Sequence, residues 1–272
     1  MLITVRFIKK SMAYATVDLG TNAFRLLIFD NKRKNVLKRY SSIIRLGSYI
    51  SKKKILMPPK SYYKALDKIF YYIQKYKVEK VLVVGTSVFR DCKNKKEITD
   101  EFYNRYKTNL EIISPSIEAK LTSQGALMPL SFNNESCLVV DIGGGSTEVI
   151  LRRKSKIEKY VSMKIGVVRE FNKYNISDSF TKSDVDRIFS DLETKILSYK
   201  FFPNLGDNKF KVVMNGGTPT TLSAIKLKLK EYDRELVNGH KLSTSYIKNV
   251  FNALLTMKSS ERLKLVGIEK GR

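Results

Sequence analysis

The first part of the chain alternates short apolar runs with turns that contain glycine and asparagine. Residues 14–22 (YATVDLGTN) form one such run, and a second apolar run, 23–31, follows directly. Two apolar runs separated by a tight turn predict a β-hairpin, and the run at 36–47 adds a third strand. The apolar runs at 79–87 and 110–115 predict two more strands.

Helical spacing of apolar residues marks the segments between these strands. Residues 58–76 begin with two prolines and carry apolar side chains every three or four positions, and 95–106 follow the same pattern more weakly. Ser114 and Pro115 suit the cap and first turn of a further helix over 116–128. Strands that alternate with helices predict an α/β domain.

The same pattern then begins again. The run 136–145 (SCLVVDIGGG) matches 14–22, so that Asp141 and Asp18 are equivalent positions, 123 residues apart (141 − 18). A repeat of this length is the size of a domain. We therefore expect two similar α/β domains that begin with β-hairpins and face one another across a cleft, at 12–133 and 134–272.

Further elements are expected in the second half of the chain. They are helices at 166–174 and 181–199, a strand at 210–217, and helices at 218–227, 243–257 and 259–265.

Three glycine turns carry the candidate chemistry. They are 18–22 (DLGTN), 141–147 (DIGGGST) and 214–221 (MNGGTPTT), the last of which leads into a helix N-terminus. Missing Cβ atoms let an anion approach consecutive backbone N–H groups, and a helix N-terminus also favours anions. Asp141 and Glu148 add hard oxygen ligands suited to Mg²⁺. The sequence thus predicts a phosphate cradle beside a divalent-cation site.

Composition narrows the choice of partners. The 51 Lys and Arg against 26 Asp and Glu give a net charge of +25, which attracts polyanions, although a lysine-rich composition is also typical of an AT-rich genome. Nucleic acid is not expected, because no stacking-aromatic motif accompanies the charge. No apolar run approaches the roughly 18–20 residues of a membrane span. Cys92 and Cys137 lack metal or redox spacing and indicate reduced thiols in a cytoplasmic protein.

Nine segments together resemble the exopolyphosphatase/guanosine pentaphosphate phosphohydrolase (Ppx/GppA) family of the actin–Hsp70–sugar kinase superfamily. They occur in family order from residue 14 to the C-terminus. The resemblance implies two actin-like, ribonuclease H-like domains of the short, two-domain type. The segments are 17–30, 45–47, 85–94, 113–121 (ISPSIEAKL), 139–151 (VVDIGGGSTEVIL), 166–170, 215–225, 235–242 and 259–272.

The resemblance also implies an activity, which is hydrolysis of the terminal phosphoanhydride of inorganic polyphosphate or of the guanosine alarmone pppGpp with Mg²⁺ or another divalent cation. It places the catalytic base at Glu118. Asp141 and Glu148 then hold the metal and position water, with Asp18 as a metal-side partner. His240 receives no catalytic role. The phosphate-binding residues implied are Asn22, Arg25, Arg90, Gly143, Gly144, Gly145, Ser146, Gly216, Gly217 and Thr218.

The chain departs from the family pattern at two places. Pro115 and Ile117 replace a glycine and a glutamate before the base, and proline cannot adopt the positive φ that glycine allows. The family continues beyond Arg272 with a strand and a helix, so we expect a second domain that lacks both elements. An exposed sheet edge would favour association, for example as a homodimer. Met12 is an alternative initiator, which would leave 1–11 outside the native protein.

Two other functions remain open. A degenerate member of the family would bind polyphosphate or an alarmone without hydrolysing it. A sugar or acetate kinase relative is disfavoured by the IEAKL segment at 117–121 and by the short chain.

Overall fold

Two compact units make up the chain in the computed structural model, Met1–Ile113 and Ser114–Arg272. The domain boundary expected at 133/134, the segment 1–11 and Arg272 lie outside the described residues, so those expectations stay predictions. The structure describes residues 12–130, 136–153, 156–174, 181–201 and 210–268.

The first unit contains the five strands that the sequence predicts, in the order β3-β2-β1-β4-β5. β1 pairs with β2, and β2 with β3, in antiparallel fashion, whereas β4 runs parallel to β1 and β5 parallel to β4. The bounds are β1 (Ala13–Leu19), β2 (Ala23–Asp30), β3 (Asn35–Ile43), β4 (Lys80–Gly85) and β5 (Leu110–Ile112).

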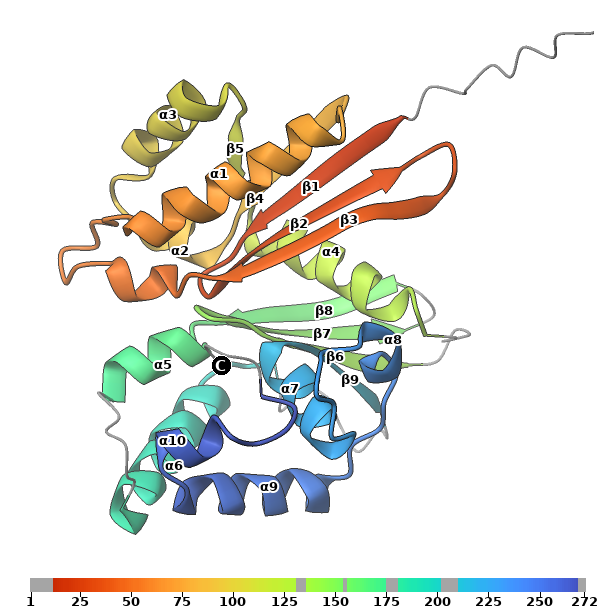
Figure 1. Ribbon diagram of the computed structural model, residues 1–272. Helices are drawn as coiled ribbons and strands as arrows, with labels where there is room; N and C mark the ends of the chain where they lie inside the picture. The colour runs from red at the N-terminus through yellow and green to blue at the C-terminus, as the bar shows by residue number, and fades with distance from the viewer. Residues whose placement is uncertain (1–11, 131–135, 154–155, 175–180, 202–209, 269–272) are drawn as a thin grey trace, which may run out of the picture. The chain divides into compact units, whose positions relative to one another are not determined.

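Helices complete the first core (Figure 1). One face of α1 places Leu66 and Ile69 in the same buried cluster as the apolar residues of the sheet. α1 also packs on α3, where Phe70 stacks on Tyr106. The helices are η1 (Leu46–Tyr49), α1 (Lys60–Lys75), α2 (Ser87–Asp91) and α3 (Lys95–Tyr106).

The second unit repeats this arrangement with a four-stranded sheet in the order β8-β7-β6-β9. β6, β7 and β8 are antiparallel, and β9 runs parallel to β6. This order matches β3-β2-β1-β4 of the first unit, as the internal repeat predicts. The bounds are β6 (Cys137–Ile142), β7 (Thr147–Arg153), β8 (Lys156–Met163) and β9 (Lys211–Gly216).

Helix α4 (Pro115–Leu127) covers one face of the second sheet, although the sequence analysis had assigned it to the first domain. Its buried Ala119 packs against Cys137, Val139 and Ile150. The helix begins as expected, because the Ser114 side chain accepts a hydrogen bond from the Ile117 amide at 3.3 Å and Pro115 occupies the first turn. Pro115 therefore leaves the start of the helix regular.

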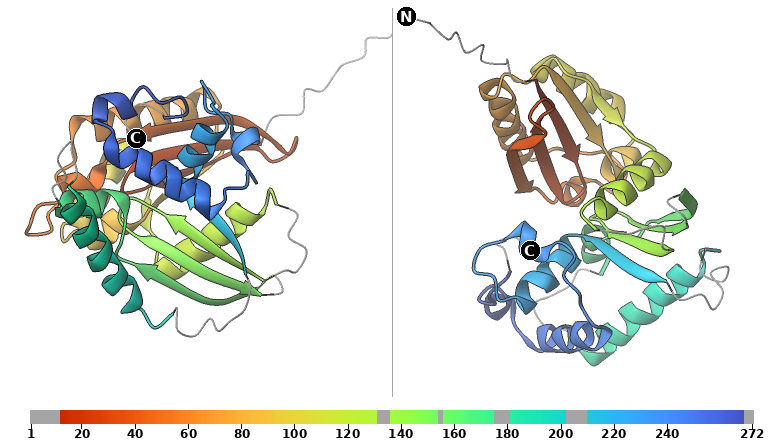
Figure 2. Two further views of the ribbon diagram at one scale, coloured as in Figure 1. Left: turned by 90° about the horizontal axis from the view of Figure 1, so that it is seen from below. Right: turned by 90° about the vertical axis from the view of Figure 1, so that its right-hand side faces the viewer.

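The opposite face of the second sheet is covered by other helices (Figures 1 and 2). Ile196 and Tyr199, at the end of α6, pack against Val149 and Leu151 of β7. In the described part of the chain, no helix is long and apolar enough to cross a bilayer. The remaining helices are α5 (Val167–Tyr174), α6 (Lys182–Leu197), α7 (Gly217–Lys226), α8 (Arg234–Val237), α9 (Thr244–Thr256) and α10 (Ser259–Arg262).

Candidate active site

Four polar residues form a row across the second sheet. Asp141 on β6 lies opposite Glu148 on β7 and Asn215 on β9, and Glu148 lies opposite Ser162 on β8. Directly opposed residues on neighbouring strands point to the same face of a sheet. That face is the one covered by α4, because Thr122 Oγ1 donates a hydrogen bond to Asp141 Oδ2 at 3.4 Å.

Both carboxylates in this row receive hydrogen bonds from its ends. Asn215 Nδ2 donates to Asp141 Oδ1 at 3.0 Å, and Ser162 Oγ donates to Glu148 Oε1 at 2.7 Å. Glu148 is only 1% exposed. The row therefore orients two acidic side chains next to each other in a largely buried place. Sequence reasoning identified the two acids but missed Ser162 and Asn215 as their partners, because the partners depend on strand register.

Glu118 lies in the first turn of α4 and is half-buried. It precedes Thr122 by four residues, so both side chains lie on the same face of the helix. The structure thus places Glu118 on the helix face from which Thr122 reaches Asp141. Among the described residues, no three or more His, Cys, Asp or Glu side chains form a group that could hold a metal ion.

Two glycine turns lie side by side at the C-terminal ends of neighbouring strands of the second sheet. β6 and β9 are parallel and end on the same rung, where Ile142 pairs with Gly216. Gly216 has a φ of +103°, and a Cβ at this position would lie 2.4 Å from the carbonyl oxygen of Ile142. Only glycine fits there. The amides of the first turn of α7, which begins at Gly217, therefore lie beside the turn 143–146.

The turn 143–146 presents its amide groups. Gly143 closes it by donating its N–H to the carbonyl of Ser146 at 3.0 Å. Within the described residues, the amides of Gly144, Gly145 and Ser146 have no protein acceptor. Consecutive amides of this kind favour an anion. A phosphate cradle at these amides, with Thr218 at the start of α7, stays a prediction.

The first unit has an equivalent turn with different charges. Gly20 donates to the carbonyl of Ala23 at 3.1 Å, as Gly143 does to Ser146. Asp18 lies opposite Arg25, and the two form an ion pair at 3.0 Å. Asn22 lies in the turn between them.

The repeat makes one difference between the units explicit. A shift of 123 residues places Arg25 at the position of Glu148. The first unit therefore pairs an acid with a base on this rung, and the second unit pairs two acids. On this rung, opposite charges meet at Asp18, whereas the second unit places two carboxylates together in a way that would favour a cation.

Arg90 lies at the end of α2 in the first unit. Its Nη1 donates a hydrogen bond to the carbonyl of Ile113 at 3.1 Å. This contact holds the segment that follows β5. A phosphate contact by Arg90 stays a prediction.

Comparisons with known proteins agree with these motifs. The family model described as the Ppx/GppA phosphatase family matches residues 27–272. The bifunctional 3-dehydroquinate synthase/phosphatase of Fusobacterium nucleatum is 28% identical over 97% of this chain and 41% of its own length. Exopolyphosphatase 2 of Mycobacterium tuberculosis is 27% identical over 95% of this chain and 84% of its own length. A guanosine-5'-triphosphate,3'-diphosphate pyrophosphatase of Aliivibrio fischeri is 27% identical over 64% of this chain and 35% of its own length.

Solved structures give the same answer for the fold. The Aquifex aeolicus PPX-GPPA enzyme is 27% identical, with a TM-score of 0.76 over 96% of this chain and 86% of that one. An exopolyphosphatase-like protein is 29% identical, with a TM-score of 0.84 over 97% of this chain and 84% of that one. These similarities confirm the expected α/β fold, which this chain shares with Ppx/GppA proteins. The chain belongs to the Ppx/GppA phosphatase family.

Proposed function

We propose that this protein hydrolyses the terminal phosphoanhydride of a phosphate chain. The names of the relatives support two substrates, since one is called an exopolyphosphatase and another acts on a guanosine triphosphate diphosphate. Inorganic polyphosphate and pppGpp end in the same chemical group, so one site could serve either.

The pair of carboxylates Asp141 and Glu148 beside the glycine turns carries the proposal. Two hard oxygen donors on one rung fit Mg²⁺, which commonly binds one or two carboxylates and completes its shell with water and phosphate oxygens. Asp18, the metal-side partner that the resemblance implies, forms an ion pair with Arg25, and its part in metal binding stays a prediction.

A bound Mg²⁺ would supply charge neutralisation on the phosphate oxygens. The chain's own residues do the remaining work in this proposal. Glu118 orients the attacking water and accepts its proton. The amides of Gly144, Gly145 and Ser146 hold phosphate oxygens through preorganised N–H groups. Positioning of this kind supplies most of the rate in phosphoryl transfer.

Further phosphate contacts belong to the same proposal. In the second unit they are the start of α7, at Gly217 and Thr218. In the first unit they are Asn22, Arg25 and Arg90, as the family resemblance implies. Arg25 would then serve both Asp18 and phosphate.

Release of phosphate from long-chain polyphosphate and from pppGpp, measured with Mg²⁺ and with EDTA, tests the proposal. We expect Mg²⁺-dependent release from at least one substrate. Folded protein that releases phosphate from neither would contradict it. Transfer of the phosphoryl group to an added sugar or acetate, in place of water, would identify a kinase instead.

A binding protein without turnover is the competing function, and Pro115, in place of the family's glycine, is one of the features of the sequence that motivate it. The regular cap at Ser114 weakens that motive, because Glu118 keeps its place in the first turn of α4. Tight binding of polyphosphate with no release of phosphate would nevertheless favour the binding protein.

A further inference from the structure

The three glycines of the turn 143–146 have their carbonyl groups turned toward α5. The carbonyl of Gly143 accepts a hydrogen bond from the Val167 amide at 3.0 Å. The carbonyl of Gly144 accepts from the amides of Val168 at 2.9 Å and Arg169 at 3.0 Å. All these donors belong to the beginning of α5, whose own first amides have no partner within the helix.

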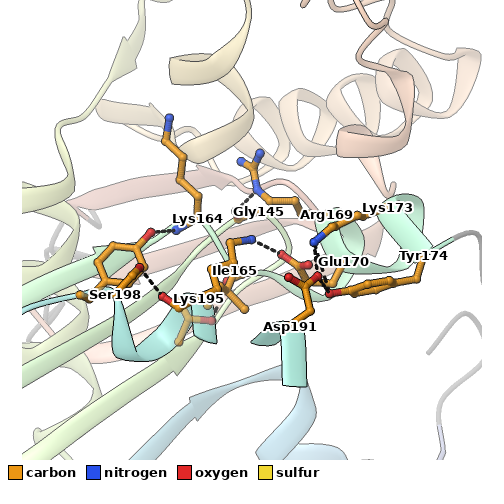
Figure 3. A network of polar contacts seen from close by, with 12 residues as sticks. Gly145, Lys164, Ile165, Arg169, Glu170, Lys173, Tyr174, Asp191, Lys195 and Ser198 are labelled. Atoms are coloured by element: carbon orange, nitrogen blue, oxygen red, sulfur yellow. Dashed lines mark hydrogen bonds and ion pairs between the residues drawn. The ribbon is translucent and has the colours of Figure 1, made fainter. Parts of the chain in front are cut away.

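The carbonyl of Gly145 is held differently, by a side chain. Arg169 Nε donates a hydrogen bond to it at 2.7 Å (Figure 3). Among the described residues of the first unit, no side chain makes such a contact to the equivalent carbonyl, that of Asn22. There, the backbone amides of Ile44 and Arg45 donate instead, both at 2.8 Å.

Fixing a carbonyl also fixes an amide. A trans peptide is planar, and its C=O and N–H groups point in opposite directions. When α5 holds the carbonyls of Gly143, Gly144 and Gly145, the N–H groups of Gly144, Gly145 and Ser146 must point away from α5. These are the amides that have no acceptor among the described residues, and they form the proposed phosphate cradle.

The hydrogen bonds to α5 are needed to fix the peptide planes because the turn consists of glycines. Residues without a Cβ adopt positive and negative φ with similar ease, so a run of three glycines can turn its peptide planes at little steric cost. Hydrogen bonds to α5 select one orientation. The packing is close, because a Cβ on Gly166 would lie 2.6 Å from backbone atoms of Gly144 and Gly145.

α5 is itself anchored to α6. Lys195 Nζ lies 2.9 Å from Glu170 Oε1, and Asp191 accepts hydrogen bonds from both Lys173 and Tyr174 (Figure 3). The Asp191 contacts lower the pKa of its carboxyl group, with the bond from Lys173 contributing most. α5, which holds the glycine turn, is thus attached to α6.

We propose that Arg169 is a positioning residue, whose Nε–H fixes the Gly145–Ser146 peptide so that the Ser146 amide faces phosphate. The proposal rests on the proposed function only for the identity of the anion. It predicts that ligand affinity and kcat/KM depend on the hydrogen bond from Arg169 to Gly145, and that they do not depend on the positive charge of Arg169.

Two substitutions separate these effects. The Nε2 of a glutamine is the same number of bonds from the backbone as the Nε of arginine, so R169Q keeps a donor at this place and loses the charge. R169M has a similar length and loses both. Arg187 lies exposed on α6 and pairs with Asp184, so R187M is a matched control for the loss of an arginine.

Two measurements are made on the full chain. The first is kcat/KM for phosphate release, together with the affinity for methylenediphosphonate, which cannot be hydrolysed. The second is the ¹⁵N relaxation order parameter of the Ser146 amide, with the thermal midpoint to check folding. We expect R169M to lose about 10-fold or more in kcat/KM and affinity, since a lost preorganised donor costs about 10²–10³ in other enzymes. Its Ser146 order parameter should fall, while R169Q and R187M stay within about threefold of the wild type.

Other results would overturn the inference. Equal losses in R169M and R169Q with a rigid Ser146 amide would show that the charge of Arg169 acts on the ligand. An unchanged R169M would show that α5 holds the turn without this side chain. If the wild type neither binds nor hydrolyses phosphate chains, the proposed function fails, and the Ser146 order parameter alone decides whether Arg169 fixes the peptide.

Discussion

Replacing Glu148 by glutamine should stabilise the metal-free protein. The Cβ atoms of directly opposed residues on neighbouring strands lie about 4.5–5.5 Å apart, and two like charges at about 5 Å repel by about 3 kcal/mol at an effective dielectric constant of about 20. Glu148 is buried beside Asp141, and the Ser162 hydroxyl could donate to a glutamine oxygen as it does to Glu148. We expect E148Q to raise the free energy of unfolding by about 1–3 kcal/mol in EDTA, or about 2–10 °C in the thermal midpoint.

Magnesium should reverse the order of stability, so that the wild type becomes more stable than E148Q. A ligand that binds only the folded state adds about 2.7 kcal/mol when its concentration is about 100 times its Kd. The wild type should therefore gain stability as Mg²⁺ is added, and E148Q should gain little. Calorimetric melts over a Mg²⁺ titration measure both effects. E158Q is the control, because Glu158 is an exposed residue of β8 that pairs with Arg153. Equal stabilisation of the wild type and E148Q by Mg²⁺ would refute the reasoning.

Two further predictions concern the backbone at Gly216 and the ionisation of Tyr63. G216A should lower the free energy of unfolding by about 1–3 kcal/mol or more, because Gly216 has a positive φ and a Cβ would approach the carbonyl of Ile142. G125A is the control, because Gly125 lies in α4 with open space around it, and it should leave the free energy of unfolding in urea unchanged or raise it. A large loss in G125A or none in G216A would contradict this account of the turn. Burial and the hydrogen bond to Glu101 raise the pKa of Tyr63 to about 12, so its contribution to stability is present below pH 10 and lost as the pH rises through about 12. Urea unfolding between pH 9 and 12 should show that the free energy of unfolding falls less steeply with pH in Y63F than in the wild type. An equally steep fall in both proteins would contradict this role of Tyr63.

The repeat in the sequence predicted much of the fold. Equivalent positions such as Asp18 and Asp141 indicated two similar units, and both sheets begin with the expected hairpin. The cap at Ser114 was also predictable, because serine followed by proline favours a helix start. These features depend on residues that are close in the chain.

Long-range packing was harder to predict. Helical spacing identified α4 but could not show which sheet it covers. In the structure, Ala119 packs against the second sheet and Ser123 accepts a hydrogen bond from Arg152 of β7. Ser162 and Asn215 became visible as partners of the two acids only through strand register. Arg169 stands in a motif that the sequence analysis noted, but its role depends on where the carbonyl of Gly145 points. The roles of Glu118 and of the phosphate-binding residues stay predictions.

The most direct test of the central claim is Mg²⁺-dependent phosphate release by E118Q, compared with the wild type and E158Q. The substitution keeps the shape of the side chain and removes the base, and general-base catalysis typically contributes about 10²–10⁴-fold. The account predicts a loss of that size in kcat for E118Q, with unchanged affinity for methylenediphosphonate and a normal melting curve. Release by E118Q at the wild-type rate would contradict it, because the water would then be activated without Glu118.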